Sequence, residues 1–307
     1  MKLLPFRIAL PLLLVVLLTG CSKPESPAEG TDPEAAKQAL VCHVGGTMRP
    51  VMQELARRYE TETGRKVEIN SAGSGELLAH IEGHERGDLY VCHDPFLDIL
   101  MDRELGIDGW TVAEITPVIA VAKGNPKNIR DLKDLTRKDV ELFLTDYKLS
   151  SLGRMLSTIF GKAGIDLAQL NEDKVIHTHR SGSHAANVVV MNNADATVVW
   201  NAVVALRKKD LDAVQITPYL PVPYVDSVTS ATKKSYILTP MRVTVATLNC
   251  ATDPEGATAF AKYLVSTKTA DVFRKFGFTM DNDIIRKEYE GGKTLPGTKP
   301  RSARAAK

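Results

Sequence analysis

The feature that most constrains this chain is a regular alternation of short apolar segments and amphipathic segments between residues 40 and 102. Short apolar runs bounded by turn residues are typical of buried strands, and apolar residues three or four apart are typical of covering helices. The predicted strands are Leu40–Val44, Lys66–Asn70 and Asp88–His93. Helices are predicted from about Arg49, after Gly75 and from Asp94. This β-α-β-α-β order predicts a parallel, doubly wound sheet.

A second alternating set follows and predicts a second α/β unit. Its strands are predicted at 115–122, 141–145 and 196–200, and a further strand at 243–248. Its helices are expected to begin near Ser151 and Ser183, and a C-terminal helix at Asp253, which is followed by a proline suited to a first helical turn. The predicted fold class is therefore α/β, with two units joined by long-range connections.

Composition excludes several classes of function. The formal net charge is +2 and no long basic cluster interrupts the body of the chain, so a nucleic-acid partner is not expected. Aromatic residues make up 6% of the chain, which favours a polar site over an aromatic sugar platform. No metalloprotease, hydrolase, nucleotide-binding or calcium-loop motif is present, so we expect a monomeric binding protein without cofactors rather than an enzyme.

The first residues have the pattern of a targeting segment. Lys2 and Arg7 precede an eleven-residue apolar run, 8–18, which is too short to span a bilayer comfortably. The run ends in Leu-Thr-Gly-Cys, which resembles the bacterial lipobox. That resemblance implies a signal peptide over 1–20 and acylation at Cys21, and an uncleaved anchor is the alternative. Residues 21–39 are then expected to form a flexible tether, and residues 286–307 a disordered basic tail.

Three turns combine glycine with hydroxyl residues just before predicted helices. They are Gly45-Gly46-Thr47, Ala72-Gly73-Ser74-Gly75 and Leu149-Ser150-Ser151-Leu152-Gly153. Helix starts carry unpaired backbone N–H groups and the positive end of the helix dipole, so several converging starts can hold an anion. Each turn taken alone is better explained by ordinary helix capping and turn formation. The three together indicate an anion site.

Residues 64–94 read GRKVEINSAGSGELLAHIEGHERGDLYVCHD and resemble the type II periplasmic binding proteins for molybdate and tungstate. The resemblance continues at 144–146, 153–154, 194–196 and 257–278. It implies a two-lobed fold with a hinge, in which 40–113 and 228–285 form one lobe and 114–227 the other. It also implies capture of a small oxyanion in the cleft between the lobes, on the outer face of a bacterial membrane, for an ABC permease. A sensor lipoprotein that reports to a membrane kinase is an alternative within the same fold.

The resemblance also implies a set of ligand contacts. Carried over residue by residue, the family's contacts fall on Gly46, Thr47, Ser74, Gly75, Ser151, Trp200 and Asn201. The family often has a tyrosine where Trp200 stands, and an indole N–H can still donate a hydrogen bond to an oxyanion.

Two Cys-His pairs, Cys42-His43 and Cys92-His93, lie on neighbouring predicted strands. Three interpretations are open: a disulfide between Cys42 and Cys92, two buried free thiols, or a site for a soft metal or metalloid that uses all four side chains. Adjacent strand residues point to opposite faces, which disfavours the third. Cys250 is expected to be a lone thiol.

Overall fold

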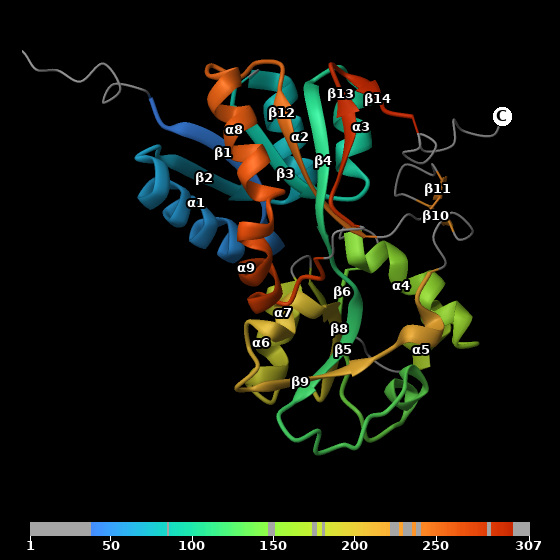
Figure 1. Ribbon diagram of the computed structural model, residues 1–307. Helices are drawn as coiled ribbons and strands as arrows, with labels where there is room; N and C mark the ends of the chain where they lie inside the picture. Colours follow the sequence, from blue (N-terminus) through green and yellow to red (C-terminus); the bar gives the residue numbers. More distant parts are fainter. Residues whose placement is uncertain are drawn as a thin grey trace, which may run out of the picture. The chain divides into compact units, whose positions relative to one another are not determined.

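The computed structural model describes residues 38–84, 86–146, 151–173, 177–179, 182–221, 227–229, 235–237, 241–280 and 284–296 (Figure 1). The expected signal peptide, the lipidation site Cys21 and nearly all of the expected tether lie outside these residues. Within them, no helix combines the length and apolar character needed to cross a bilayer.

The predicted β-α-β-α-β unit is confirmed and contributes three strands to a seven-stranded sheet. Its elements are β1 (Leu40–Gly45), α1 (Arg49–Thr63), β2 (Val67–Ala72), α2 (Ser74–His84), β3 (Leu89–His93) and α3 (Phe96–Asp102), with a 3-10 turn, η1 (Gly46–Met48), before α1. Strand β1 pairs in parallel with both β2 and β3. Helix α1 ends at Gly64, whose φ of 73° is readily adopted only by glycine.

The other four strands of this sheet come from later parts of the chain. Its strands are β4 (Gly106–Glu114), β12 (Arg242–Leu248), β13 (Arg286–Glu290) and β14 (Lys293–Thr294). The order across the sheet is β14-β13-β4-β12-β3-β1-β2, and β12 is antiparallel to both of its neighbours. The expected disordered tail is therefore wrong at its beginning, because residues 286–290 form a strand that pairs with β4 on one side and with β14 on the other. Residues 297–307 lie outside the described residues.

Helices cover both faces of the first sheet, as the doubly wound pattern predicted. Helices α1, α8 (Pro254–Leu264) and α9 (Ala270–Lys275), with the short η4 (Thr267–Thr269), pack on one face, where they share the larger hydrophobic core. Helices α2 and α3 pack on the other face over a smaller core that includes Tyr90 and Cys92. We refer to this sheet and its helices as the first lobe.

The second sheet is built around β5 (Pro117–Ala122), which β8 (Ala196–Trp200) and β9 (Leu211–Gln215) flank in antiparallel pairing. A parallel pair, β6 (Phe143–Thr145) with β7 (His177–His179), adjoins it through a bridge between Leu142 and Ala196. The remaining elements are η2 (Leu132–Thr136), α4 (Ser151–Lys162), α5 (Leu167–Asp173), α6 (Gly182–Val190), α7 (Asn201–Ala205), η3 (Thr217–Tyr219), β10 (Ser227–Thr229) and β11 (Ser235–Ile237). We refer to this group as the second lobe. The first sheet thus combines parallel and antiparallel pairs, whereas β5, β8 and β9 pair only in antiparallel orientation and the parallel pair β6-β7 is separate.

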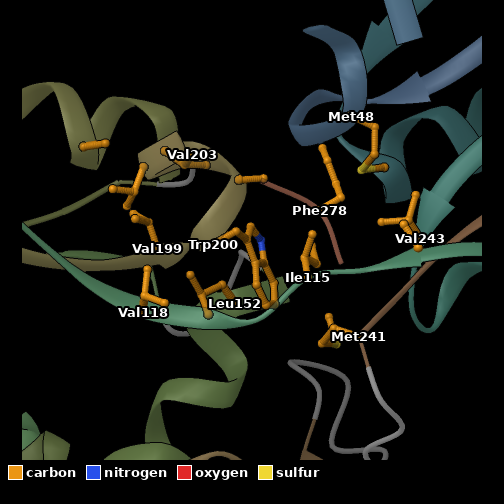
Figure 2. Close-up of a cluster of buried hydrophobic side chains, with 14 of the residues drawn as sticks. Met48, Ile115, Val118, Leu152, Val199, Trp200, Val203, Met241, Val243 and Phe278 are labelled. Atoms are coloured by element: carbon orange, nitrogen blue, oxygen red, sulfur yellow. The ribbon is translucent and has the colours of Figure 1, made fainter. Parts of the chain in front are cut away.

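The chain passes from the first sheet to the second with only two residues between β4 and β5, Ile115 and Thr116. It returns just before β12, where the Met241 carbonyl accepts a hydrogen bond from the Ile115 N–H at 3.0 Å. A single core cluster runs past this junction (Figure 2), where Trp200 lies among Leu152 and Ile115. The expected first boundary, at 113–114, falls at the end of β4.

Candidate functional site

A pocket of about 630 Å³ lies at the ends of strands from both sheets. Its lining residues come from helix starts and strand ends of both lobes. The lining residues of the first lobe are Gly46, Thr47, Ala72, Gly73, Ser74, Gly75, Glu76, His93 and Phe96, and those of the second lobe are Thr145, Leu152, Arg154, Gly182, Ser183, Trp200 and Val203. This is the position, beyond the carboxyl ends of strands, at which open α/β sheets bind ligands.

On the first-lobe side, the hydroxyl of Ser74 is enclosed at the start of α2. Ser74 is 7% exposed, and its Oγ has no hydrogen-bond partner within the described part of the chain. The Tyr90 hydroxyl donates to the Ser74 carbonyl at 2.6 Å, which anchors this helix start to β3. A Cβ atom on Gly45 would lie only 2.6 Å from Ser74 Oγ, so the absence of a side chain at position 45 makes room for the hydroxyl. The glycine therefore shapes the site without lining it.

On the second-lobe side, Thr145 ends β6 and is 1% exposed. Its Oγ1 also lacks a partner among the described residues. Gly182 begins α6 next to Thr145. A Cβ atom at position 182 would lie 3.7 Å from Thr145 Cγ2, which is an ordinary van der Waals distance. Half-buried Arg154, from the first turn of α4, brings the positive charge of a guanidinium to the same wall. The two lobes thus each contribute a lining residue whose hydroxyl is buried and has no partner among the described residues.

His93, the last residue of β3, is the titratable side chain most deeply enclosed in the pocket lining, at 8% exposure. Its Nδ1 lies 3.1 Å from the Asp94 carbonyl oxygen, and its ring lies close to those of Phe96 and Trp200. Burial lowers the pKa of the imidazole below its ordinary 6.5, against a smaller opposing effect of Asp94. The ring is therefore neutral at pH 7.

Beside the pocket, Asp94 binds Arg242 through two carboxylate contacts, one of 2.6 Å from Nη2. Arg242 also contacts Asp98 and Glu288, and all four side chains are buried or nearly so. The Arg242 guanidinium thus faces three carboxylates, one of which, Glu288, also pairs with Arg286. Burial raises the pKa of Asp98, Arg242 opposes this rise, and the neighbouring carboxylates Asp94 and Glu288 add to it. The cluster joins β3, α3, β12 and β13 next to the His93 end of the pocket.

Most residues that the sequence predicted as ligand contacts come together here. Gly46, Thr47, Ser74, Gly75 and Trp200 all line the pocket. Ser151 begins α4, whose next residues Leu152 and Arg154 are in the lining. Sequence reasoning did not select Thr145, Arg154 or His93 as ligand contacts, although Thr145 and His93 each end a predicted strand.

Asn201, also expected as a contact, is not among the lining residues. Its side-chain oxygen accepts from the Thr116 N–H at 3.1 Å, and its amide nitrogen donates to the Gly277 carbonyl at 2.8 Å. These bonds tie the start of α7 to the junction between the sheets and to the segment after α9. The Asn201 side-chain amide therefore hydrogen-bonds to backbone groups of the protein.

A disulfide between Cys42 and Cys92 is wrong: both are free and buried. Strand β1 pairs Cys42 with Leu89, so Cys92 lies three residues further along β3, about 10 Å at the usual rise. The two thiols also face opposite sides of the sheet, Cys42 in the larger core and Cys92 in the smaller one. Alternation separates the two histidines in the same way, so the four side chains cannot form one metal site. Burial raises the pKa of both thiols, that of Cys92 to about 12.

Two α/β lobes joined by a short junction, with a pocket lined from both, define the class of two-lobed solute-binding proteins. The chain belongs to the bacterial extracellular solute-binding protein family, whose profile matches residues 40–279. The predicted resemblance to the molybdate-type periplasmic proteins is confirmed.

Relatives and solved structures agree with this assignment. The molybdate-binding protein ModA of Mycobacterium tuberculosis H37Rv is 24% identical over 191 residues, which cover 61% of this chain and 70% of that protein. A Haemophilus influenzae relative is 26% identical over 162 residues, 52% of this chain and 65% of that protein, so the alignment spans just under two thirds of its length.

Among solved structures, the periplasmic molybdate-binding protein of Azotobacter vinelandii superposes with a TM-score of 0.60 at 14% identity, covering 79% of this chain and 100% of that one. The sulfate-binding protein SubI from Mycobacterium tuberculosis H37Rv gives 0.61 at 18% identity, covering 81% and 89%. These likenesses establish the fold.

Proposed function

We propose that this protein captures a small tetrahedral oxyanion of the molybdate type in the pocket between its lobes and delivers it to an ABC importer. The relatives named above for molybdate and sulfate support this class of ligand. The pocket itself supplies the chemical argument, because its hydrogen-bonding groups suit an anion with several acceptor oxygens.

The observation that carries the proposal is the pair of unpartnered hydroxyls, Ser74 Oγ and Thr145 Oγ1. Buried polar groups are nearly always hydrogen-bonded, and leaving one without a partner costs about 1–3 kcal/mol. Both residues line the same pocket and come from different lobes. A ligand whose oxygens accept from both would recover this cost in the complex.

Backbone and charge add to these donors. Helix α2 begins at Ser74 and α4 at Ser151, so two helix starts with free N–H groups border the pocket. Gly46, Gly73 and Gly75 leave the backbone accessible to a ligand on the first-lobe side. Arg154 offsets part of the charge of a dianion. These donors select for charge and for the number of acceptor oxygens.

The volume of the pocket implies closure. A pocket of about 630 Å³ is in the size range that accommodates drug-sized ligands, whereas a tetraoxyanion has only four oxygens. For Ser74 and Thr145 to bond one such anion, the lobes must approach each other about the junction at residues 115–116 and 241. We propose that this closed form is the one that docks on the permease.

We also retain acylation at Cys21 as part of this proposal, with the tether connecting the binding domain to the outer face of a membrane. Replacing Cys21 with Ala is then expected to move the protein from the membrane fraction to the soluble fraction. Mass spectrometry of the wild-type N-terminus would show the acylated cysteine, and an unmodified Cys21 would contradict the anchor while leaving the binding proposal untouched.

Calorimetric titration with molybdate, tungstate, sulfate and phosphate tests the binding proposal. We expect equimolar binding of molybdate or tungstate. Ser74→Ala and Thr145→Val should each weaken binding by about 1–3 kcal/mol, roughly 5- to 150-fold. Thr197→Val is the matched control, because its buried Oγ1 also lacks a described partner but Thr197 is not in the pocket lining. An absence of heat with every anion would overturn the proposed function.

A further inference from the structure

His93 differs from the other enclosed side chains of the pocket because its ring can offer a nitrogen lone pair, whereas the carboxylate in the lining, Glu76, is exposed. Its Nδ1 faces the Asp94 carbonyl oxygen, which can only accept a hydrogen bond, so Nδ1 carries the proton. In the neutral ring, Nε2 then has a free lone pair. Nε2 is not hydrogen-bonded to any described residue, and His93 lines the pocket, so Nε2 is the ring atom left to meet a bound molecule.

A lone pair at this enclosed position conflicts with a bare oxyanion. Two acceptors facing each other repel, unless a proton lies between them. A tetraoxyanion without a hydroxyl, such as molybdate near neutral pH, brings no such proton. An anion with its own O–H group, such as hydrogen phosphate, does.

Resting on the function proposed above, we propose that the occupied pocket holds one proton between Nε2 of His93 and an oxygen of the bound anion. The anion and the proton bind together. An anion that carries a hydroxyl supplies the proton itself, and a fully ionised anion takes it up from solvent. His93 is then the residue that links the choice of anion, and its affinity, to pH.

The charged groups around His93 are compatible with this role. On its own strand end Asp94 lies adjacent, and it is paired with Arg242 of β12. Asp98 of α3 and Glu288 of β13 complete the cluster, which has more carboxylates than guanidinium groups. Glu76 of α2 and Arg154 of α4 line the pocket. In the empty protein burial dominates and keeps the ring neutral, with its pKa lowered. An entering dianion adds negative charge next to the ring and favours its protonated form.

The expected pH dependence follows from proton linkage. Free His93 has a pKa below 6.5, so above that pH the empty protein must take up a proton on binding a fully ionised anion. The Kd for molybdate should then rise by up to about tenfold per pH unit between pH 6.5 and 8.5. Titration in two buffers with different enthalpies of ionisation should give an uptake of close to one proton per anion.

Two variants separate this role from simple packing. His93→Gln replaces Nε2 with an amide that donates at every pH, so its molybdate affinity should be nearly independent of pH. His80→Gln is the matched control: His80 is exposed on α2, packs near His43 and His84, and is absent from the lining. It should keep the wild-type pH profile.

The outcomes separate the two proposals. If molybdate binds the wild-type protein with a constant Kd from pH 6.5 to 8.5 and no proton uptake, the role of His93 is refuted and the proposed function stands. A wild-type pH slope retained in His93→Gln also refutes it. If no anion binds at any pH, the proposed function itself fails. Should His93→Gln not fold, the proton count on the wild-type protein still decides the question.

Discussion

Replacing Gly45 with Ala tests whether the enclosed hydroxyl of Ser74 contributes to ligand binding. Gly45 has φ −56° and ψ 139°, a conformation that alanine adopts without strain, so the effect of the substitution is purely steric. The added Cβ would lie 2.6 Å from Ser74 Oγ and 2.7 Å from Met48 Cε. Ordinary contact begins at about 3.4 Å, so the Ser74 hydroxyl must move by about 0.8 Å.

A shift of this size breaks a hydrogen bond aimed at a bound anion. We expect Gly45→Ala to lose about 1–3 kcal/mol of binding free energy, roughly 5- to 150-fold in Kd. Overpacking against Met48 should also lower the free energy of unfolding by about 1–3 kcal/mol. Calorimetric titration with molybdate measures the first quantity, and urea unfolding of the empty protein measures the second.

Gly83→Ala is the matched control, because position 83 is exposed within the same helix as Ser74 and no atom lies within 4 Å of its added Cβ. It should leave affinity unchanged and add up to about 1 kcal/mol of stability. In a Ser74→Ala background, Gly45→Ala should cost much less affinity than it does alone, since the displaced hydroxyl is already gone. Wild-type affinity in Gly45→Ala, or equal costs in both backgrounds, would show that Ser74 Oγ plays no part in binding.

Three further predictions follow from buried side chains. The thiols of Cys42 and Cys92 should react with a disulfide reagent only after unfolding, and reductant should not change Tm; a Tm that falls with reductant would contradict their separation. Because burial also lowers the pKa of His43, the unfolded chain binds more protons below pH 6.5, so stability should fall as the pH drops from 6.5 towards 5. Urea unfolding across this range should show a smaller pH dependence in His43→Asn, and an unchanged dependence would assign it to other groups. Tryptophan fluorescence should change when an anion binds, and Trp200→Phe, but not Trp110→Phe, should abolish the change, because only Trp200 lines the pocket.

The local β-α-β-α-β pattern was predictable because short turns join its elements and each helix has one apolar face. Strand β13, RKEYE, was missed because most of its side chains are charged or half-buried, so it lacks the apolar run that marks a central strand. The antiparallel position of β12 depends on pairing between residues more than 100 positions apart, such as Val245 with Val91. No local pattern reports such a pairing.

The candidate site was predicted in part for a similar reason. Glycine and serine at helix starts carry a local signal, so Gly46, Thr47 and Ser74 could be selected from their turns. Thr145 and His93 look like ordinary last residues of strands in the sequence. They belong to the site only because the folded chain brings the other lobe opposite them. At position 201 the expectation and the structure differ in the opposite way. The sequence predicts that Asn201 contacts the ligand, whereas its side-chain amide hydrogen-bonds to the backbone at Thr116 and Gly277.

The position of β12 between β3 and β4 has a consequence for the order in which the protein can assemble. Until residues 242–248 are available, the inner edges of β3 and β4 have no partner, although both strands precede them by more than 125 residues. The first sheet therefore cannot close during most of synthesis. Closure of this sheet therefore depends on pairings between residues far apart in the chain, which form slowly because a long loop must be ordered first.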